Sequence, residues 1–191
     1  MRREHLLAAA ERVFGRQPFD EASMQQIASE AGLGMHGLYG HFPSKQKLYE
    51  QVVLHRLDEI ERQARVAFAI DNPFDRLRAL ATVYAGFFLE APQFFPLWAR
   101  QKLSYDWGQK TRFGAAIDGR LADQQRRMER ALSAAANAGI LRKIEPSLLV
   151  ELANSIFSAV VQHEVHHGQK DAVACTDLML DLLLKGAGAR P

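Results

Sequence analysis

Residues 22–48 have the sequence ASMQQIASEAGLGMHGLYGHFPSKQKL, in which small and apolar residues recur at the spacing of a helix-turn-helix. A small residue at Ala28 suits the close crossing of two helices, and Gly32 can take the positive φ that a tight interhelical turn requires. Leu38 is predicted to anchor the second helix inward, and Ser23 is a good N-cap for the first. The pattern therefore predicts two short helices joined by a tight turn.

Further residue types fall at fixed offsets across these two helices, the turn and the start of a third helix. They are Ile27-Ala28, Ala31-Gly32, Leu38-Tyr39, His41-Phe42, Ser44-Lys45 and Leu48. In these residues the stretch resembles the DNA-binding domain of the tetracycline-repressor (TetR) family. The resemblance implies an all-α protein with an N-terminal helix-turn-helix domain of three helices, residues 1–47. A helical domain for effector binding and dimerisation, residues 48–191, would follow it.

The second helix of the motif departs from the family pattern. Gly34 stands where a Ser or Thr N-cap is common, Met35 where a basic residue is frequent, and His36-Gly37 where Gly-Thr is usual. Each glycine in residues 34–40 costs up to about 1 kcal/mol of helix stability relative to alanine. This helix is therefore expected to depend on tertiary packing for its stability.

The resemblance implies which residues face DNA. Tyr39, His41 and Lys45 match phosphate-contacting positions, and Gln25, Met35, His36 and Gly37 lie where base edges of the major groove are within reach. The predicted DNA-facing set is Ser23, Gln25, Met35, His36, Gly37, Tyr39, His41 and Lys45. A packing or capping role is the alternative for His41. If Lys45 binds phosphate, its loss should flatten the salt dependence of binding by roughly one unit.

Composition bounds the class of protein. The chain has 191 residues, of which 48% are hydrophobic, so it can bury a substantial core. We expect a cytoplasmic protein, because no apolar run approaches the roughly 18 residues of a membrane span and the N-terminus lacks a signal-peptide pattern. The net charge is only +2, and residues 1–50 hold as many acidic as basic residues, so charge alone does not indicate nucleic-acid binding. The single cysteine, Cys175, is expected to be a small buried residue.

Helical periodicity and capping residues predict helices along the whole chain. Besides the motif, these cover about residues 2–15, 45–68, 73–90, 119–139, 146–168 and 171–185, with one more opened by Pro92. Residues 104–118 have the weakest pattern.

Residues 84–113 hold more than half of the aromatic residues. Ordinary core packing explains such density, whereas the family resemblance implies an effector cavity. The predicted cavity walls are Phe88, Phe95, Trp98 and Trp107, and the predicted polar contacts are Arg100, Asn154, Ser158 and Gln162. Aromatic walls favour a small apolar or aromatic effector.

The last two predicted helices carry leucines and other apolar residues in helical register. These are Leu148, Leu149, Leu152, Ile156, Val160, Leu178, Leu182 and Leu183. The segments resemble the dimer interface of the family, in which two helices from each chain form a four-helix bundle. A homodimer presents two recognition helices to a pseudo-palindromic operator on double-stranded DNA. Intrachain core packing is the alternative.

The resemblance predicts a repressor, released from its operator by a small molecule, with no enzymatic activity, cofactor, metal or membrane partner. Two alternatives remain open. Residues 163–167, HEVHH, match the zinc-hydrolase pattern H-E-x-x-H, in which His163 and His167 bind the metal and Glu164 is the base. The unusual residues 34–37 also fit a helical interaction module that binds no operator.

Overall fold

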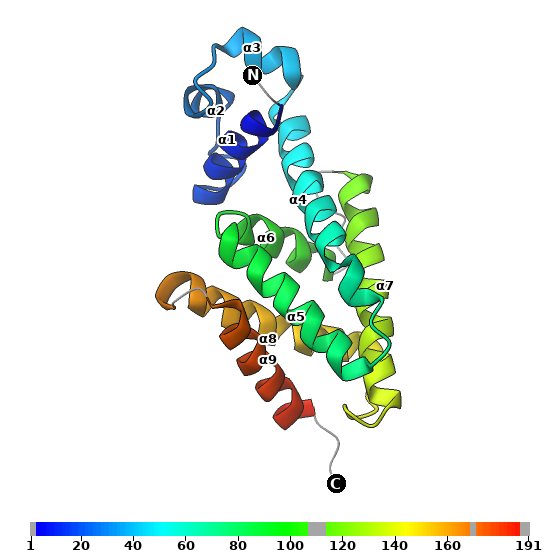
Figure 1. Ribbon diagram of the computed structural model, residues 1–191. Coiled ribbons are helices and arrows are strands. Elements are labelled where there is room, and N and C mark those ends of the chain that lie inside the picture. The colour runs from blue at the N-terminus through cyan, green and yellow to red at the C-terminus, as the bar shows by residue number, and fades with distance from the viewer. Residues whose placement is uncertain (1–2, 107–113, 169–170, 188–191) are drawn as a thin grey trace. The chain divides into compact units, whose positions relative to one another are not determined.

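The computed structural model describes residues 3–106, 114–168 and 171–187 of the chain, which fold into helices (Figure 1). The helices are α1 Arg3–Arg16, α2 Met24–Glu30, α3 Met35–His41, α4 Lys45–Phe68, α5 Pro73–Glu90, α6 Phe95–Asp106, α7 Ala115–Asn137, α8 Pro146–His167 and α9 Ala172–Ala187. The predicted all-α fold class is thereby confirmed.

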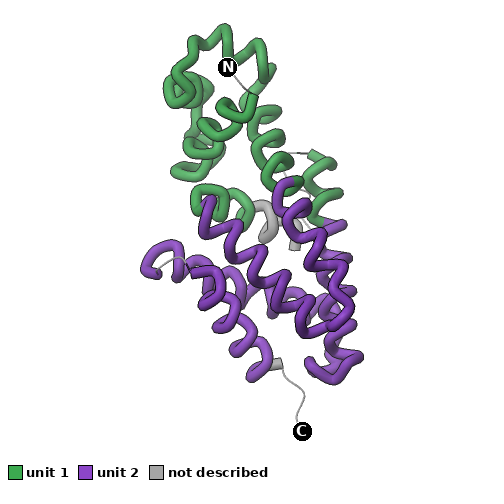
Figure 2. Tube along the Cα trace, in the orientation of Figure 1, with its two compact units in different colours: residues 1–58, 92–121 green, residues 59–91, 122–191 purple. Residues whose placement is uncertain are grey.

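The chain forms two compact units that alternate along the sequence (Figure 2). Unit 1 consists of Met1–Asp58 and Pro92–Leu121, and unit 2 of Glu59–Ala91 and Ala122–Pro191. Helices α4 and α7 each continue from one unit into the other. Helix α6 thus belongs to the same compact unit as the N-terminal helices. The functional boundary predicted between residues 47 and 48 stays a prediction.

The head of unit 1, which comprises α1, α2, α3 and the start of α4, has a core of large apolar side chains. Its fully buried members include Leu6, Phe14, Ile27, Leu38, Phe42, Leu48 and Tyr49. The rings of Phe14 and Tyr49 meet edge to face, with centroids 4.9 Å apart. Because α2 and α3 have seven residues each, this core must supply stability that such short helices lack in isolation.

The turn between α2 and α3 has the predicted geometry. Gly32 adopts φ 64°, and the amide of Leu33 donates to the Ala28 carbonyl at 2.8 Å. Ser23 caps α2, whereas Gly34 caps α3 without a side-chain hydrogen bond. The sequence-based account of both helix starts is confirmed.

In unit 2, α5 and α8 pack against α9. A cluster of buried side chains consists of Ala85, Leu89, Val160, Cys175 and Met179. Cys175 is 1% exposed, as expected for a small buried residue, and burial raises the pKa of its thiol to about 11.

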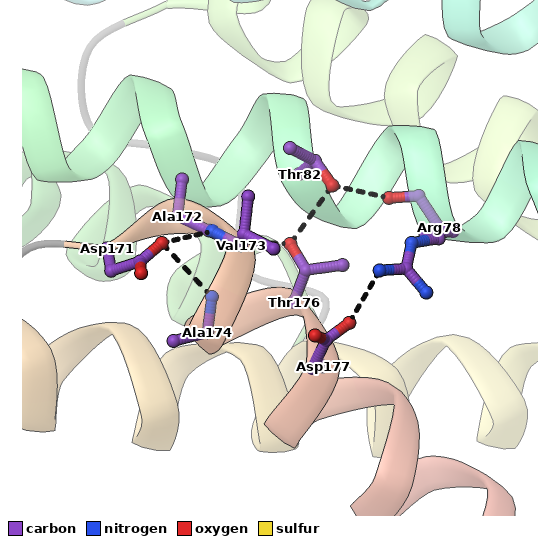
Figure 3. Close-up of polar contacts among 8 residues, drawn as sticks. All are labelled: Arg78, Thr82, Asp171, Ala172, Val173, Ala174, Thr176 and Asp177. Carbon is purple, nitrogen blue, oxygen red and sulfur yellow. Dashed lines mark hydrogen bonds and ion pairs between the residues drawn. The ribbon is translucent and has the colours of Figure 1, made fainter.

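Polar contacts also join α5 to α9 (Figure 3). The Thr176 hydroxyl donates to the Thr82 hydroxyl oxygen at 3.1 Å, and Arg78 Nη2 lies 2.9 Å from Asp177 Oδ1. Asp171 accepts from the amides of Val173 and Ala174, and so caps the start of α9. The buried Thr176 hydroxyl thereby has polar partners.

Two helix starts differ from the sequence-based expectation. Helix α6 begins at Phe95, three residues after Pro92, and α7 begins at Ala115, before the expected Gly119. Gly114 has φ 118°, and its carbonyl accepts from the amide of Ile117, so the turn that starts α7 lies earlier in the sequence.

In the described part of the chain, no helix combines the length and the apolar character needed to cross a bilayer.

Candidate nucleic-acid interface and effector region

Helix α3 has one buried face and one exposed face. Leu38 is 0% exposed and the C-cap residue Phe42 is 2% exposed, so they attach the helix to the core. The predicted base-contacting residues Met35, His36 and Gly37 are exposed, as are Tyr39 and His41. A short helix held from one side presents its other face to an external surface. The structure therefore leaves these predicted DNA-facing residues accessible, and their individual roles stay predictions.

The start of α2 is held by a reciprocal capping box. The Ser23 hydroxyl accepts from the Gln26 amide at 3.1 Å, and Gln26 Oε1 accepts from the Ser23 amide at 2.8 Å. Gln17 Nε2 also donates to Gln26 Oε1 at 3.0 Å. The Ser23 hydroxyl thus caps the first turn of α2, while Gln25 in the same turn is exposed. Sequence reasoning missed Gln26, although the S-x-x-Q spacing is a signal for it.

Three basic side chains of the head have acidic partners within it. Arg12 Nε lies 2.6 Å and Arg16 Nη1 3.3 Å from the Glu30 carboxylate, and Lys47 Nζ lies 2.8 Å from Glu50. The hydrogen bond from Arg12 lowers the pKa of Glu30. Each of these pairs neutralises a basic side chain of the head. The positive potential available to bind phosphate is therefore reduced.

Lys45 has a location that the sequence did not suggest. Its ammonium donates to the main-chain carbonyls of Phe19 at 2.8 Å and Ala22 at 2.7 Å. The side chain is half-buried. The structure therefore gives Lys45 intramolecular partners, in place of the open position expected of a phosphate ligand.

Part of the predicted effector region lies in unit 2. Phe88 is fully buried, and Asn154 and Ser158 are half-buried on α8. The Phe88 ring meets Phe157 edge to face, with centroids 5.7 Å apart. Phe157 also contacts Tyr84 at 6.2 Å between centroids. Sequence reasoning did not select Phe157, because single aromatic residues on apolar helices carry no distinguishing signal.

Tyr84 brings a polar group into this aromatic cluster. Gln124 Nε2 donates to the Tyr84 hydroxyl oxygen at 2.9 Å. Burial raises the pKa of Tyr84 to about 12, despite the opposing effect of this hydrogen bond. The hydroxyl is therefore neutral at physiological pH, and Tyr84 and Gln124 join Asn154 and Ser158 as polar groups of unit 2.

The other predicted effector residues are placed differently. Phe95 and Trp98 are buried in unit 1, with ring centroids 5.8 Å apart. Arg100 is exposed and donates to the main chain of α1 at Phe14, at 3.5 Å. Gln162 is exposed on α8, and Trp107 lies outside the described residues. The predicted effector residues are thus divided between the two units, and the cavity itself stays a prediction.

The apolar stripe of α8 and α9 divides into a buried and an exposed set. Leu149, Val160 and Leu183 are buried within the chain. By contrast, the exposed members are Leu148 at 46%, Leu152 at 39%, Leu178 at 46% and Leu182 at 45%. Intrachain packing thus accounts for only part of the stripe, and an exposed apolar set on two adjacent helices remains.

The HEVHH segment ends α8. The rings of His163 and His167 lie 5.4 Å apart between centroids, and His163 Nδ1 is 3.9 Å from Glu164 Oε1. Among residues 3–106, 114–168 and 171–187, no group of three or more His, Cys, Asp or Glu side chains gathers in a metal-binding arrangement. The described residues therefore supply no third ligand for the zinc-hydrolase alternative.

Sequence comparisons point to one family. Residues 6–52 match the model of bacterial regulatory proteins, tetR family. The chain is 38% identical over 88 residues to the HTH-type transcriptional activator FasR of Mycolicibacterium smegmatis, across 45% of this chain and 40% of that protein. It is 26% identical over 102 residues to the HTH-type transcriptional repressor NicS of Pseudomonas putida, across 53% and 48% respectively. The chain thus spans less than half the length of either relative.

Solved structures share the fold over nearly the whole chain. The ketosteroid transcriptional regulator KstR2 of Mycobacterium tuberculosis superposes with a TM-score of 0.83 and 20% identity, over 100% of this chain and 96% of that chain. AibR, in complex with isovaleryl coenzyme A and operator DNA, superposes with a TM-score of 0.70 and 22% identity, over 94% and 96%. Residues 6–52 of the chain thus belong to the tetR family of bacterial regulatory proteins, and the chain shares its all-α fold with these solved regulators.

Proposed function

We propose that this protein is a ligand-responsive transcriptional repressor that binds a pseudo-palindromic operator as a homodimer. A small apolar or aromatic effector releases it from the DNA. The observation that carries the proposal is the exposed face of α3, which consists of Met35, His36, Gly37 and Tyr39, while Leu38 is buried and anchors the helix to the core. Major-groove recognition by a helix-turn-helix uses such a helix, with base-contacting residues outward and its register set by the core.

The dimer is proposed from the exposed leucines of α8 and α9. Four leucines at 39–46% exposure lie on helices that already pack together within unit 2. A second copy of the same pair of helices would bury them in a four-helix bundle. Two-fold symmetry then relates the two copies of α3, which is the geometry that a pseudo-palindrome requires.

The effector site is proposed around the aromatic residues of α5 and α8 in unit 2. Phe88, Tyr84 and Phe157 supply apolar surface, and Gln124 supplies a polar contact in unit 2. Aromatic walls with few polar groups suit an apolar or flat ligand. AibR, which shares the fold, was solved with isovaleryl coenzyme A, so an acyl thioester is a reasonable first compound to screen.

The proposed route from the effector to DNA uses α1, α4 and α6. Arg56 of α4 pairs with Glu11 of α1, and Gln93, just before α6, donates to the same carboxylate at 2.9 Å. A displacement of α6 would therefore act on the head through α1, in addition to a tilt of α4. An effector can drive such a change only by binding one arrangement better than the other.

The test is selection of random duplex DNA on the purified protein, repeated with Tyr39→Phe. We expect enrichment of a pseudo-palindrome, and weaker binding by Tyr39→Phe, which lacks only the hydroxyl proposed to contact phosphate. If the folded wild-type protein enriches no sequence, the operator-binding proposal fails and the interaction-module alternative replaces it.

A further inference from the structure

We infer that Lys45 is a positioning residue, which holds the loop before α2 in the arrangement that DNA binding requires and does not itself contact a phosphate. The inference rests on the proposed function, because it concerns how the head presents α2 and α3 to an operator. The loop comprises residues 17–23, between α1 and α2.

The Lys45 ammonium has three carbonyl partners in this loop. Its Nζ donates to the carbonyls of Ala22 at 2.7 Å and Phe19 at 2.8 Å, and more weakly to that of Asp20 at 3.4 Å. An ammonium group carries three N–H donors. Three converging carbonyls therefore match its full donor capacity, and a phosphate could bind only by displacing at least one of them.

An aromatic ring adds a fourth contact. Lys45 Nζ lies 4.4 Å from the centroid of the Phe19 ring, within the range of a cation–π interaction. Tyr49, one turn later in α4, meets the same ring edge to face at 5.3 Å. Phe14 of α1 stacks on it at 5.9 Å. Phe19 is thus held from α1 and α4 together, and Lys45 completes this attachment.

The location of the bound carbonyls connects Lys45 to the DNA-facing surface. Ala22 is 2% exposed and directly precedes Ser23, the N-cap of α2. A fixed Ala22 carbonyl determines where α2 starts, and therefore where the exposed Gln25 projects. Because Lys45 is also the first residue of α4, one side chain links the beginnings of two helices in the domain.

Two substitutions at Lys45 and one control separate this role from a phosphate contact. Lys45→Met keeps the aliphatic stem but removes the donors, and Lys45→Arg restores N–H donors on a longer side chain. Lys47→Met is the control, since it removes the same charge from an exposed position on the same turn. Each full-length variant is titrated with the selected duplex at several salt concentrations, at a temperature where circular dichroism shows it folded.

We expect Lys45→Met to weaken binding by about tenfold, as for the loss of one charge-assisted hydrogen bond. The slope of log K against log salt should stay within about 0.3 of the wild-type value, since a lost phosphate contact would reduce it by about 0.9. Lys45→Arg should recover part of the affinity. A slope reduced by about one unit in Lys45→Met, with Lys47→Met unchanged, would overturn the inference.

Amide hydrogen exchange without DNA supplies the second measurement. The amides of Glu21 and Ala22 both donate to the Pro18 carbonyl, and that of Gln26 donates to the Ser23 hydroxyl. In Lys45→Met these amides should exchange at least about tenfold faster, while those in the middle of α1 keep the wild-type rate. Acceleration throughout the head, or none at residues 21–26, would contradict a local positioning role. Failure of the proposed function is distinguishable, because the wild-type protein itself would then select no duplex.

Discussion

Arg56 of α4 binds Glu11 of α1 through two parallel hydrogen bonds, from Nε to Oε2 at 2.6 Å and from Nη2 to Oε1 at 3.0 Å. The Glu11 side chain is 3% exposed, so its charge is balanced inside the protein and not by water. Buried bidentate pairs of this kind are costly to break from one side, because the remaining charge keeps its desolvation penalty.

We therefore expect Arg56→Met to lower the free energy of unfolding by about 3 kcal/mol, since it leaves the Glu11 carboxylate buried without its cation. The double variant Glu11→Leu with Arg56→Met should be more stable than Arg56→Met alone. Urea denaturation of the wild-type protein and the variants measures both effects. A loss in the double variant equal to the sum of the losses in Glu11→Leu and Arg56→Met would show that the two side chains do not depend on one another.

Gly15 and Gly40 form a matched pair for substitution by alanine. A Cβ at Gly15 would lie 2.5 Å from the Gln93 carbonyl oxygen, whereas a Cβ at Gly40 would have nothing within 4 Å. Gly15→Ala should destabilise the chain by about 1–3 kcal/mol, because backbone has to move. Gly40→Ala should stabilise it by up to about 1 kcal/mol through the helix propensity of alanine. Thermal unfolding of both variants checks the opposite signs, and equal shifts would contradict the close approach at Gly15.

Tyr84 should make stability depend on pH in the alkaline range. Burial raises its pKa to about 12, above the ordinary value of 10.0, so the folded chain holds the hydroxyl proton more tightly than the unfolded chain does. This contribution is complete below pH 10 and is lost as the pH rises towards 12. Between pH 9 and 11.5 the wild-type protein should lose about 2 kcal/mol more than Tyr84→Phe in urea denaturation. Parallel losses in the two proteins would place the titration elsewhere.

Charges on the exposed leucines of α8 and α9 should prevent dimer formation. Leu152→Lys combined with Leu182→Lys places two cations on the proposed interface, where they would be desolvated and would face their symmetry mates. Size-exclusion chromatography with light scattering should report a monomer. Val66→Lys is the control, because Val66 is 76% exposed and lies outside α8 and α9. A dimer that survives both leucine substitutions would locate its interface on another surface.

Substitution of a residue that contacts a base should change which DNA sequences the protein binds, and not only how tightly it binds them. We expect His36→Ala and Gln25→Ala to alter the duplex selected from a random pool, by about 1–3 kcal/mol of discrimination at the affected position. Tyr39→Phe should weaken all sequences alike. Repeating the selection with each variant distinguishes the two classes. An unchanged preference in both alanine variants would assign base reading to other residues of α3.

The sequence by itself determined the local framework of the head, because neighbouring residues encode it. The Ser23 cap, the positive φ of Gly32 and the inward Leu38 depend on backbone preferences and helical periodicity within a few residues. The glycine-rich start of α3 could be predicted for the same reason. Each of these features depends on a segment of chain shorter than the helix-turn-helix motif.

Only the tertiary structure decided the partners of the long polar side chains. Lys45 binds carbonyls more than twenty positions away, and Glu11 meets both Arg56 and Gln93. A motif marks Lys45 as a cation near DNA, but whether its charge meets phosphate or backbone depends on where a distant loop lies. The stripe of α8 and α9 divides likewise, because periodicity identifies an apolar face, whereas burial of Leu149 and exposure of Leu148 depend on which helices pack beside it.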